Sequence, residues 1–135
     1  MYSNYYSPAD WEKIMTFSKN KETPFLVVLL DRIRQKYEEF RAHFPSAKIY
    51  YAVKANPGVE LLALLRDLGS YFDIASIYEL DRVLGLGVSA DRVSFGNTIK
   101  KARHIREAYK KGVRLFTSDC EMDVRNLARE APGSR

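Results

Sequence analysis

Lys54, Asp73 and Glu79 are the side chains of this 135-residue chain whose types and spacing could do chemistry. Lys54 follows the apolar stretch 49–53. A lysine amine whose pKa is lowered by partial burial is a nucleophile, and it forms a Schiff base with an aldehyde. The alternative is an ordinary surface charge, which residue type alone favours. The place of Lys54 in its element has to decide between the two.

The stretch 49–54 is predicted to be a short buried strand that ends on Lys54. Because side chains alternate along a strand, Tyr50, Ala52 and Lys54 share one face. A sharp turn follows, with Asn56 predicted as the cap of the next helix and Pro57 as its first residue. Catalytic groups of α/β proteins collect at the carboxyl ends of strands, so this position brings the reactive amine level with the surface charge and leaves both open.

Asp73 lies in the next predicted strand, 71–75, on the face that Tyr71 and Ala75 share. A carboxylate in an otherwise apolar strand is costly unless it is paired. Consecutive strands are usually neighbours in a sheet, so Lys54 is the expected partner of Asp73. The alternative is a surface acid near the end of the strand.

Glu79 belongs to the motif Ser76-x-x-Glu79, which is a capping box, and that role explains the residue fully. A functional role for Glu79 would be additional. Asn97 and Ser118 are expected to cap two later helices, Ser118 as part of a second capping box. N–H groups at such helix starts can hold an anion, but none of them stands out.

The elements that must position these side chains follow an alternating pattern. Ser7 and Pro8 begin a first helix, and the apolar run 24–30 fits a strand buried on both faces. A helix from Asp31 then stops at Pro45. From the lysine strand onward, strands and helices alternate at the spacing of βαβ units, which demands a parallel sheet. The later predicted strands are 71–75, 92–96 and 113–117.

Two folds can contain such a parallel sheet. No GxGxxG follows a strand and no GxxxxGK[ST] occurs, which disfavours a doubly wound nucleotide fold. The other fold is a (β/α)8 barrel, which needs about 200 residues or more. We therefore expect an α/β chain that supplies the first part, about half, of such a barrel. Residues 1–24 are expected to form an N-terminal helical segment and residues 25–135 a partial barrel domain of a longer protein.

Composition indicates a globular protein, with 46% hydrophobic residues and a net charge of +5. Pairs such as Lys100-Lys101 and Lys110-Lys111 are typical of solvated helix faces, not of a nucleic-acid interface. The single Cys120 excludes an internal disulfide and a zinc motif, and it is interpreted as a buried or half-buried thiol. Residues 1–5 do not read as a signal peptide, and no apolar run could span a bilayer, so we expect a cytoplasmic protein without a membrane partner.

Four ordered motifs resemble one known family. They are Tyr51-Ala52-Val53-Lys54-Ala55-Asn56-Pro57, Phe72-Asp73-Ile74-Ala75-Ser76 with Glu79-Leu80, Phe95-Gly96-Asn97-Thr98-Ile99-Lys100-Lys101, and Gly112-Val113-Arg114-Leu115-Phe116-Thr117-Ser118-Asp119. In order and spacing they resemble the amino-terminal barrel part of the ornithine/diaminopimelate/arginine decarboxylases, and most of all the ornithine or lysine/ornithine branch. These are pyridoxal-phosphate enzymes of the alanine-racemase-like (β/α)8 barrel fold.

The resemblance implies roles for four residues and implies no metal. The lysine of the AVKAN motif, here Lys54, binds the pyridoxal phosphate cofactor covalently, and the aspartate of the FDxAS motif, here Asp73, lies close to it. Glu79 lies near the ring of the cofactor, and Ala52 lines the same pocket. Leu29 departs from the family, whose first strand often carries an acidic residue at that place.

The function that the resemblance implies is decarboxylation of a basic L-amino acid, ornithine or possibly lysine, in polyamine biosynthesis, with putrescine as the product from ornithine. The parent protein would be a homodimeric carboxy-lyase with no nucleic-acid partner. The phosphate-binding and substrate-binding residues of the family come from later segments, so the 135-residue chain alone is expected to be inactive. Two alternatives stay open. One is another barrel enzyme, such as a diaminopimelate decarboxylase or a racemase, and the other is a non-catalytic binding protein like the antizyme inhibitors.

Overall fold

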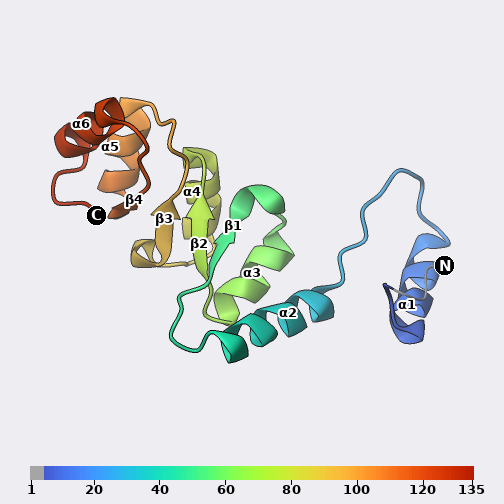
Figure 1. Cartoon of the computed structure of the whole chain (residues 1–135). Coiled ribbons are helices and arrows are strands. Elements are labelled where there is room, and N and C mark those ends of the chain that lie inside the picture. The colour runs from blue at the N-terminus through green and yellow to red at the C-terminus, as the bar shows by residue number, and fades with distance from the viewer. Residues whose placement is uncertain (1–4) are drawn as a thin grey trace.

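A parallel sheet of four strands, in the order β1-β2-β3-β4, forms the centre of the computed structural model, which describes residues 5–135 (Figure 1). The strands are β1 (Tyr50–Ala52), β2 (Tyr71–Ile74), β3 (Val93–Phe95) and β4 (Leu115–Phe116). The α-helices are α1 (Pro8–Ser18), α2 (Leu30–His43), α3 (Val59–Asp67), α4 (Ile77–Gly85), α5 (Ala102–Lys110) and α6 (Glu121–Glu130). Short 3-10 helices are η2 (Val53–Ala55) and η3 (Ala90–Arg92).

Each strand pairs with the next one along the chain, and a helix connects each pair. A doubly wound sheet reverses its strand order at one point, whereas a barrel wall runs on in sequence. The order found here is that of a barrel wall, which confirms the predicted fold class. The backbone of Arg135 also bonds to Arg114 and Phe116, as a further parallel neighbour of β4 would.

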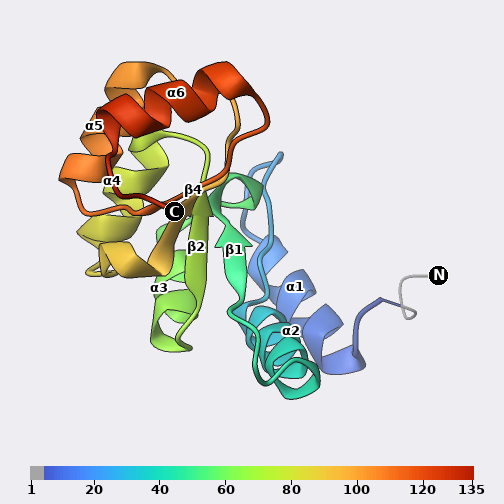
Figure 2. The ribbon, with the colours of Figure 1, turned by 60° about the vertical axis from the view of Figure 1, so that its left-hand side comes forward.

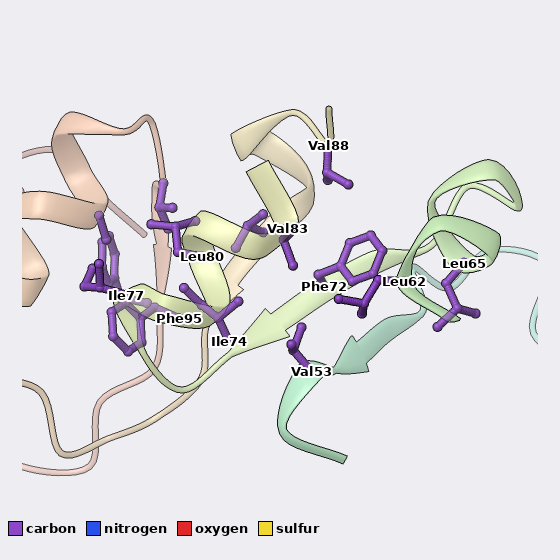
Figure 3. Packing of buried hydrophobic residues seen from close by; sticks show 14 of the residues in the cluster. Val53, Leu62, Leu65, Phe72, Ile74, Ile77, Leu80, Val83, Val88 and Phe95 are labelled. Atoms are coloured by element: carbon purple, nitrogen blue, oxygen red, sulfur yellow. The ribbon is translucent and has the colours of Figure 1, made fainter. Parts of the chain in front are cut away.

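Burial alternates along β2 and separates the two faces of the sheet. Phe72 and Ile74 are fully buried, whereas Tyr71 and Asp73 are only half-buried. Helix residues such as Leu62 complete one hydrophobic core on the Phe72 side (Figure 3). The helices therefore cover one face, and the other face is left for polar residues.

The connecting helices form because apolar residues recur at helical spacing on the side that meets the sheet. Their fully buried members include Leu62 of α3, Leu80 and Val83 of α4, and Ile105 of α5. Gly69 follows α3 with a φ of 87°, a left-handed conformation that favours glycine and ends the helix. These helices confirm the predicted βαβ alternation.

The first helix begins as predicted. The side chain of Ser7 accepts a hydrogen bond from the Asp10 N–H at 3.1 Å, and Pro8 is the first helical residue. Arg32 of α2 holds Asp10 in an ion pair of 2.6 Å. Figures 1 and 2 both place α1 at the β1 end of the molecule, away from β3 and β4.

The strand predicted over residues 24–30 is wrong. Residues 25–29 have no regular secondary structure, and α2 already begins at Leu30. Leu26 is 79% exposed, so the run is not buried on both faces. An apolar run becomes a strand only where a neighbouring strand pairs with it, and no ladder partner meets this run among residues 5–135.

Two predicted helix starts are also wrong. Helix α3 begins at Val59 after Gly58, and helix α5 begins at Ala102 after Lys101, so neither Asn56 nor Asn97 caps a helix. Asn56 and Asn97 instead hydrogen bond within their own turns. Short polar side chains readily make such local bonds, which compete with capping.

The second capping box is likewise absent, because α6 begins at Glu121 after Cys120 and has no side-chain cap. Ser118 donates instead to the carbonyl of Cys120 at 3.3 Å. Cys120 is exposed, and not the buried or half-buried thiol that was expected. Lys100 is buried, which contradicts its interpretation as part of a solvated helix face.

The expected absence of a signal peptide concerned residues 1–5, and residues 1–4 lie outside the described part of the chain. Within the described part, none of the helices has both the length and the apolar character that a membrane crossing requires.

Phe72→Ala should lower the free energy of unfolding of the chain by about 3–5 kcal/mol, because it empties the centre of the only core cluster of the described residues. Phe40→Ala is the matched control, since Phe40 is 57% exposed, and its effect should stay within about 0.5 kcal/mol. Urea denaturation followed by circular dichroism measures both values. Equal losses in the two variants would contradict the assignment of the core.

Candidate active site

Lys54 lies just beyond the carboxyl end of β1, in the 3-10 turn η2. The strand itself ends at Ala52, two residues earlier than predicted. Val53 is fully buried and anchors the turn in the core (Figure 3). The Tyr51 hydroxyl donates to the Asn56 carbonyl at 3.2 Å and closes the turn on its other side. Burial raises the pKa of Tyr51 above its usual value, which favours the protonated hydroxyl that donates this bond.

The side chain of Lys54 is exposed, and no residue of the part from 5 to 135 forms an ion pair or hydrogen bond with its amine. The expected pair with Asp73 is therefore not formed in this structure. Asp73 instead accepts a hydrogen bond of 2.5 Å from the Ser94 hydroxyl of β3. The turn carries Lys54 out of the strand direction, and Ser94 takes the place that had been assigned to the amine.

The register of the sheet brings Asp73 between two small side chains. Ala52 of β1 lies beside Asp73, and Asp73 lies beside Ser94 of β3. Paired residues of parallel strands point to the same face, so these three share the face that the helices leave uncovered. Ala52 thus lies on the same face as Asp73 and brings little bulk to it.

Gly96, the residue after β3, lets the backbone approach the Asp73 carboxylate. A Cβ at position 96 would lie 2.2 Å from Asp73 Oδ1 and 2.4 Å from Oδ2. Such distances are far below van der Waals contact, so only glycine fits here while the carboxylate keeps its position. Ser94 and Gly96 therefore fix where the Asp73 carboxylate lies.

Glu79 joins the end of β2 to the start of α4. Its N–H donates to the Ser76 side chain at 3.3 Å, and its carboxylate accepts from the Ala75 N–H at 2.7 Å. The capping box is thus confirmed, with its return bond made to Ala75 instead of to the cap residue. The carboxylate stays at the carboxyl end of the sheet, the same end as Lys54.

An apolar groove of about 560 Å³ runs along the free side of β1. Ala52 and Ala55 line it beside Tyr50, with Tyr37 and Phe40 of α2 opposite. Neither Lys54 nor Asp73 contributes to its wall. The groove adjoins the candidate site without containing its ionisable groups.

Ser94, Gly96 and Lys100 are the residues near the site that sequence reasoning missed. Ser94 is a polar residue between the apolar Val93 and Phe95, and that alternation could have placed it on the face of Asp73. Gly96 and Lys100 gave no such signal, because their roles depend on contacts with residues distant in sequence.

The family model described as "Pyridoxal-dependent decarboxylase, pyridoxal binding domain" matches residues 30–135. Among curated proteins, the lysine/ornithine decarboxylase of Selenomonas ruminantium is 39% identical over 123 residues, which are 91% of this chain and 31% of the relative. Antizyme inhibitor 2 of Xenopus laevis is 33% identical over 111 residues, which are 82% of this chain and 24% of the relative.

Among solved structures, the lysine/ornithine decarboxylase from Vibrio vulnificus complexed with putrescine matches with a TM-score of 0.83 and 27% identity. The match covers 91% of this chain and 34% of that structure. The chain thus spans about a third or less of the length of these relatives. Since the family model matches most of the chain, the protein belongs to the pyridoxal-dependent decarboxylases and contains residues of their pyridoxal binding domain.

Proposed function

We propose that the protein containing this chain is a pyridoxal-phosphate-dependent carboxy-lyase that decarboxylates a basic L-amino acid, ornithine or lysine. The observation that carries the proposal is the amine of Lys54, which lies at the carboxyl end of the barrel wall with no charged partner among residues 5–135. The match to a pyridoxal binding domain and the ornithine and lysine decarboxylases among the relatives support it.

The residues at this end of the sheet fit an aldehyde cofactor. An exposed primary amine without an ion pair in the described residues is the group that an aldehyde needs, and Lys54 provides it. Carboxylates at the same end complement the positive charge of a protonated pyridine or substrate, and Asp73 and Glu79 provide these. We therefore propose Lys54, Asp73, Glu79 and Ala52 as the residues of this chain that hold the cofactor.

Each proposed residue has a distinct task. Lys54 would hold the cofactor covalently through its amine. Asp73, oriented by Ser94, presents a fixed carboxylate on the face of the sheet that the helices leave uncovered. Ala52 leaves space beside that carboxylate, and Glu79 stabilises the end of β2. The bound cofactor would supply the sink for the electrons left when carbon dioxide departs.

The full-length protein would supply groups that this chain does not contain. The groups that bind the phosphate and the substrate would come from outside the chain, and the whole protein would be a homodimer. We retain the division into an N-terminal helical segment, 1–24, and a barrel portion, 25–135, together with the cytoplasmic location, as proposals.

A second candidate function is non-catalytic binding of a protein partner, which the similarity to antizyme inhibitor 2 favours. The presence of both Lys54 and Asp73 in this chain favours the enzyme. Binding of pyridoxal phosphate by the full-length protein separates the two, because the candidate without catalysis has no need of the cofactor.

Lys54→Ala in the full-length protein should abolish covalent cofactor binding and lower decarboxylation of ornithine and lysine by at least about 10³-fold, since no other amine of the described residues occupies this turn. Borohydride reduction followed by peptide mass spectrometry should place a pyridoxyl group on Lys54 of the wild-type protein. Lys110→Ala, which removes an exposed lysine of α5, is the control and should behave as wild type. Normal turnover by Lys54→Ala would refute the assignment.

Gly96→Ala in the full-length protein should raise the dissociation constant for pyridoxal phosphate about 10- to 100-fold, because the new Cβ displaces the Asp73 carboxylate. Gly85→Ala is a matched control, since a Cβ there meets nothing within 4 Å. Absorbance titration with the cofactor measures both affinities. Unchanged affinity in Gly96→Ala would show that the position of Asp73 does not matter for the cofactor.

The purified 135-residue chain should show no turnover of ornithine or lysine. Residues 5–135 contain four strands of a barrel wall, which is half of the eight that enclose a barrel site. A coupled assay for released carbon dioxide, with the full-length protein as the positive control, measures this. Turnover by the isolated chain would contradict the expectation.

A further inference from the structure

Lys100 has a fully buried side chain, and the proposed chemistry gives it no task. Its Nζ lies 2.6 Å from Asp123 Oδ2 and 2.7 Å from the Thr117 carbonyl oxygen. It also lies 3.1 Å from the Asn97 carbonyl and 3.2 Å from the Thr98 carbonyl. An ammonium group has three N–H donors, and here four oxygen acceptors surround them.

These four acceptors come from three segments that meet at the carboxyl end of the sheet. Asn97 and Thr98 lie in the loop after β3, and Thr117 follows β4. Asp123 lies in the first turn of α6. A single buried ammonium group therefore joins the ends of two neighbouring strands to the helix that follows them.

The loop that Lys100 holds is also the loop that contacts the candidate site. Gly96 directly precedes Asn97, and its backbone lies so close to Asp73 that a Cβ would collide with the carboxylate. A shift of the Asn97 and Thr98 carbonyls would move Gly96 with them. The loop thus connects the contacts of Lys100 to the place of the Asp73 carboxylate.

A buried ion pair such as that of Lys100 with Asp123 is by itself weak evidence for a gain in stability. Removing two charges from water is costly, and well-packed apolar residues of similar volume are often as stable or more so. Asp123 Oδ1 is buried and has no hydrogen-bond partner among the described residues, so the pair is incompletely satisfied. The benefit of Lys100 lies in the specific carbonyl groups that it holds.

We propose that Lys100 is a positioning residue that holds the loop 96–98 against Asp73 and so keeps the cofactor site in its binding geometry. The inference rests on the proposed function and deepens it. Lys100 acts through the loop, because its buried ammonium group is engaged by oxygen atoms of the protein itself.

The test uses the full-length protein with the double variant Lys100→Met/Asp123→Leu, which removes both buried charges and keeps the volume filled. Lys101→Met, which removes the exposed neighbouring charge, is the matched control. In the double variant, amide hydrogen exchange in residues 96–99 should accelerate about tenfold, and the dissociation constant for pyridoxal phosphate should rise about 10- to 100-fold. The melting temperature of the protein without cofactor should fall, because the carbonyls of Asn97, Thr98 and Thr117 lose the donor that Lys100 supplies.

The control should leave exchange and affinity unchanged. Wild-type exchange in residues 96–99 together with wild-type cofactor affinity in the folded double variant would overturn the proposal. If the wild-type protein bound no pyridoxal phosphate, the proposed function would fail, while the exchange measurement on the loop would still decide the role of Lys100.

A measurement on the wild-type protein covers the case in which the double variant does not fold. With ¹⁵N-labelled lysine, the ammonium protons of Lys100 should exchange slowly with water, and their resonance should shift when pyridoxal phosphate binds. The resonance of the exposed Lys101 should not shift. A Lys100 resonance that is the same with and without bound cofactor would overturn the proposal.

Discussion

The helices must cover one face of the sheet, and this constraint places the polar residues of the candidate site on the other face. In β2, Phe72 and Ile74 are fully buried in the core. Because side chains alternate along a strand, Asp73 can only point to the opposite face. The parallel register extends this arrangement to the neighbouring strands, so that Ala52 and Ser94 lie on either side of Asp73. The core thus determines which strand residues face the candidate site.

Alternation along β2 is a local pattern, so the sequence was sufficient to predict which face Asp73 occupies. The partner of Asp73 is not a local property. Lys54 lies beyond the last residue of β1, and the turn that carries it depends on burial of Val53 and on the bond from Tyr51 to Asn56. A prediction that continued the strand through Lys54 therefore paired the wrong groups.

Elements that depend on neighbours in sequence were predicted correctly, whereas elements that depend on distant residues were not. The capping box of Ser76 and Glu79 was predicted correctly, because its bonds join residues that are close in sequence. The run 24–30 was read as a strand from its apolar character, although a strand exists only where a partner supplies hydrogen bonds. Asn56 was read as a helix cap, but its side chain bonds to the Gly58 N–H at 2.9 Å and the helix starts later.

Lys100 and Lys101 show that sequence alone does not predict burial, since these two adjacent residues of one type have opposite environments. Lys101 is exposed, whereas Lys100 is buried against Asp123, a residue 23 positions further along the chain. Where strands end, carbonyl groups lose their ladder partners and still require donors when they are buried. The Lys100 ammonium supplies donors to the carbonyls of Asn97, Thr98 and Thr117 at once. The site therefore rests on the apolar core behind Asp73 and on a buried charge beside the loop that contacts it.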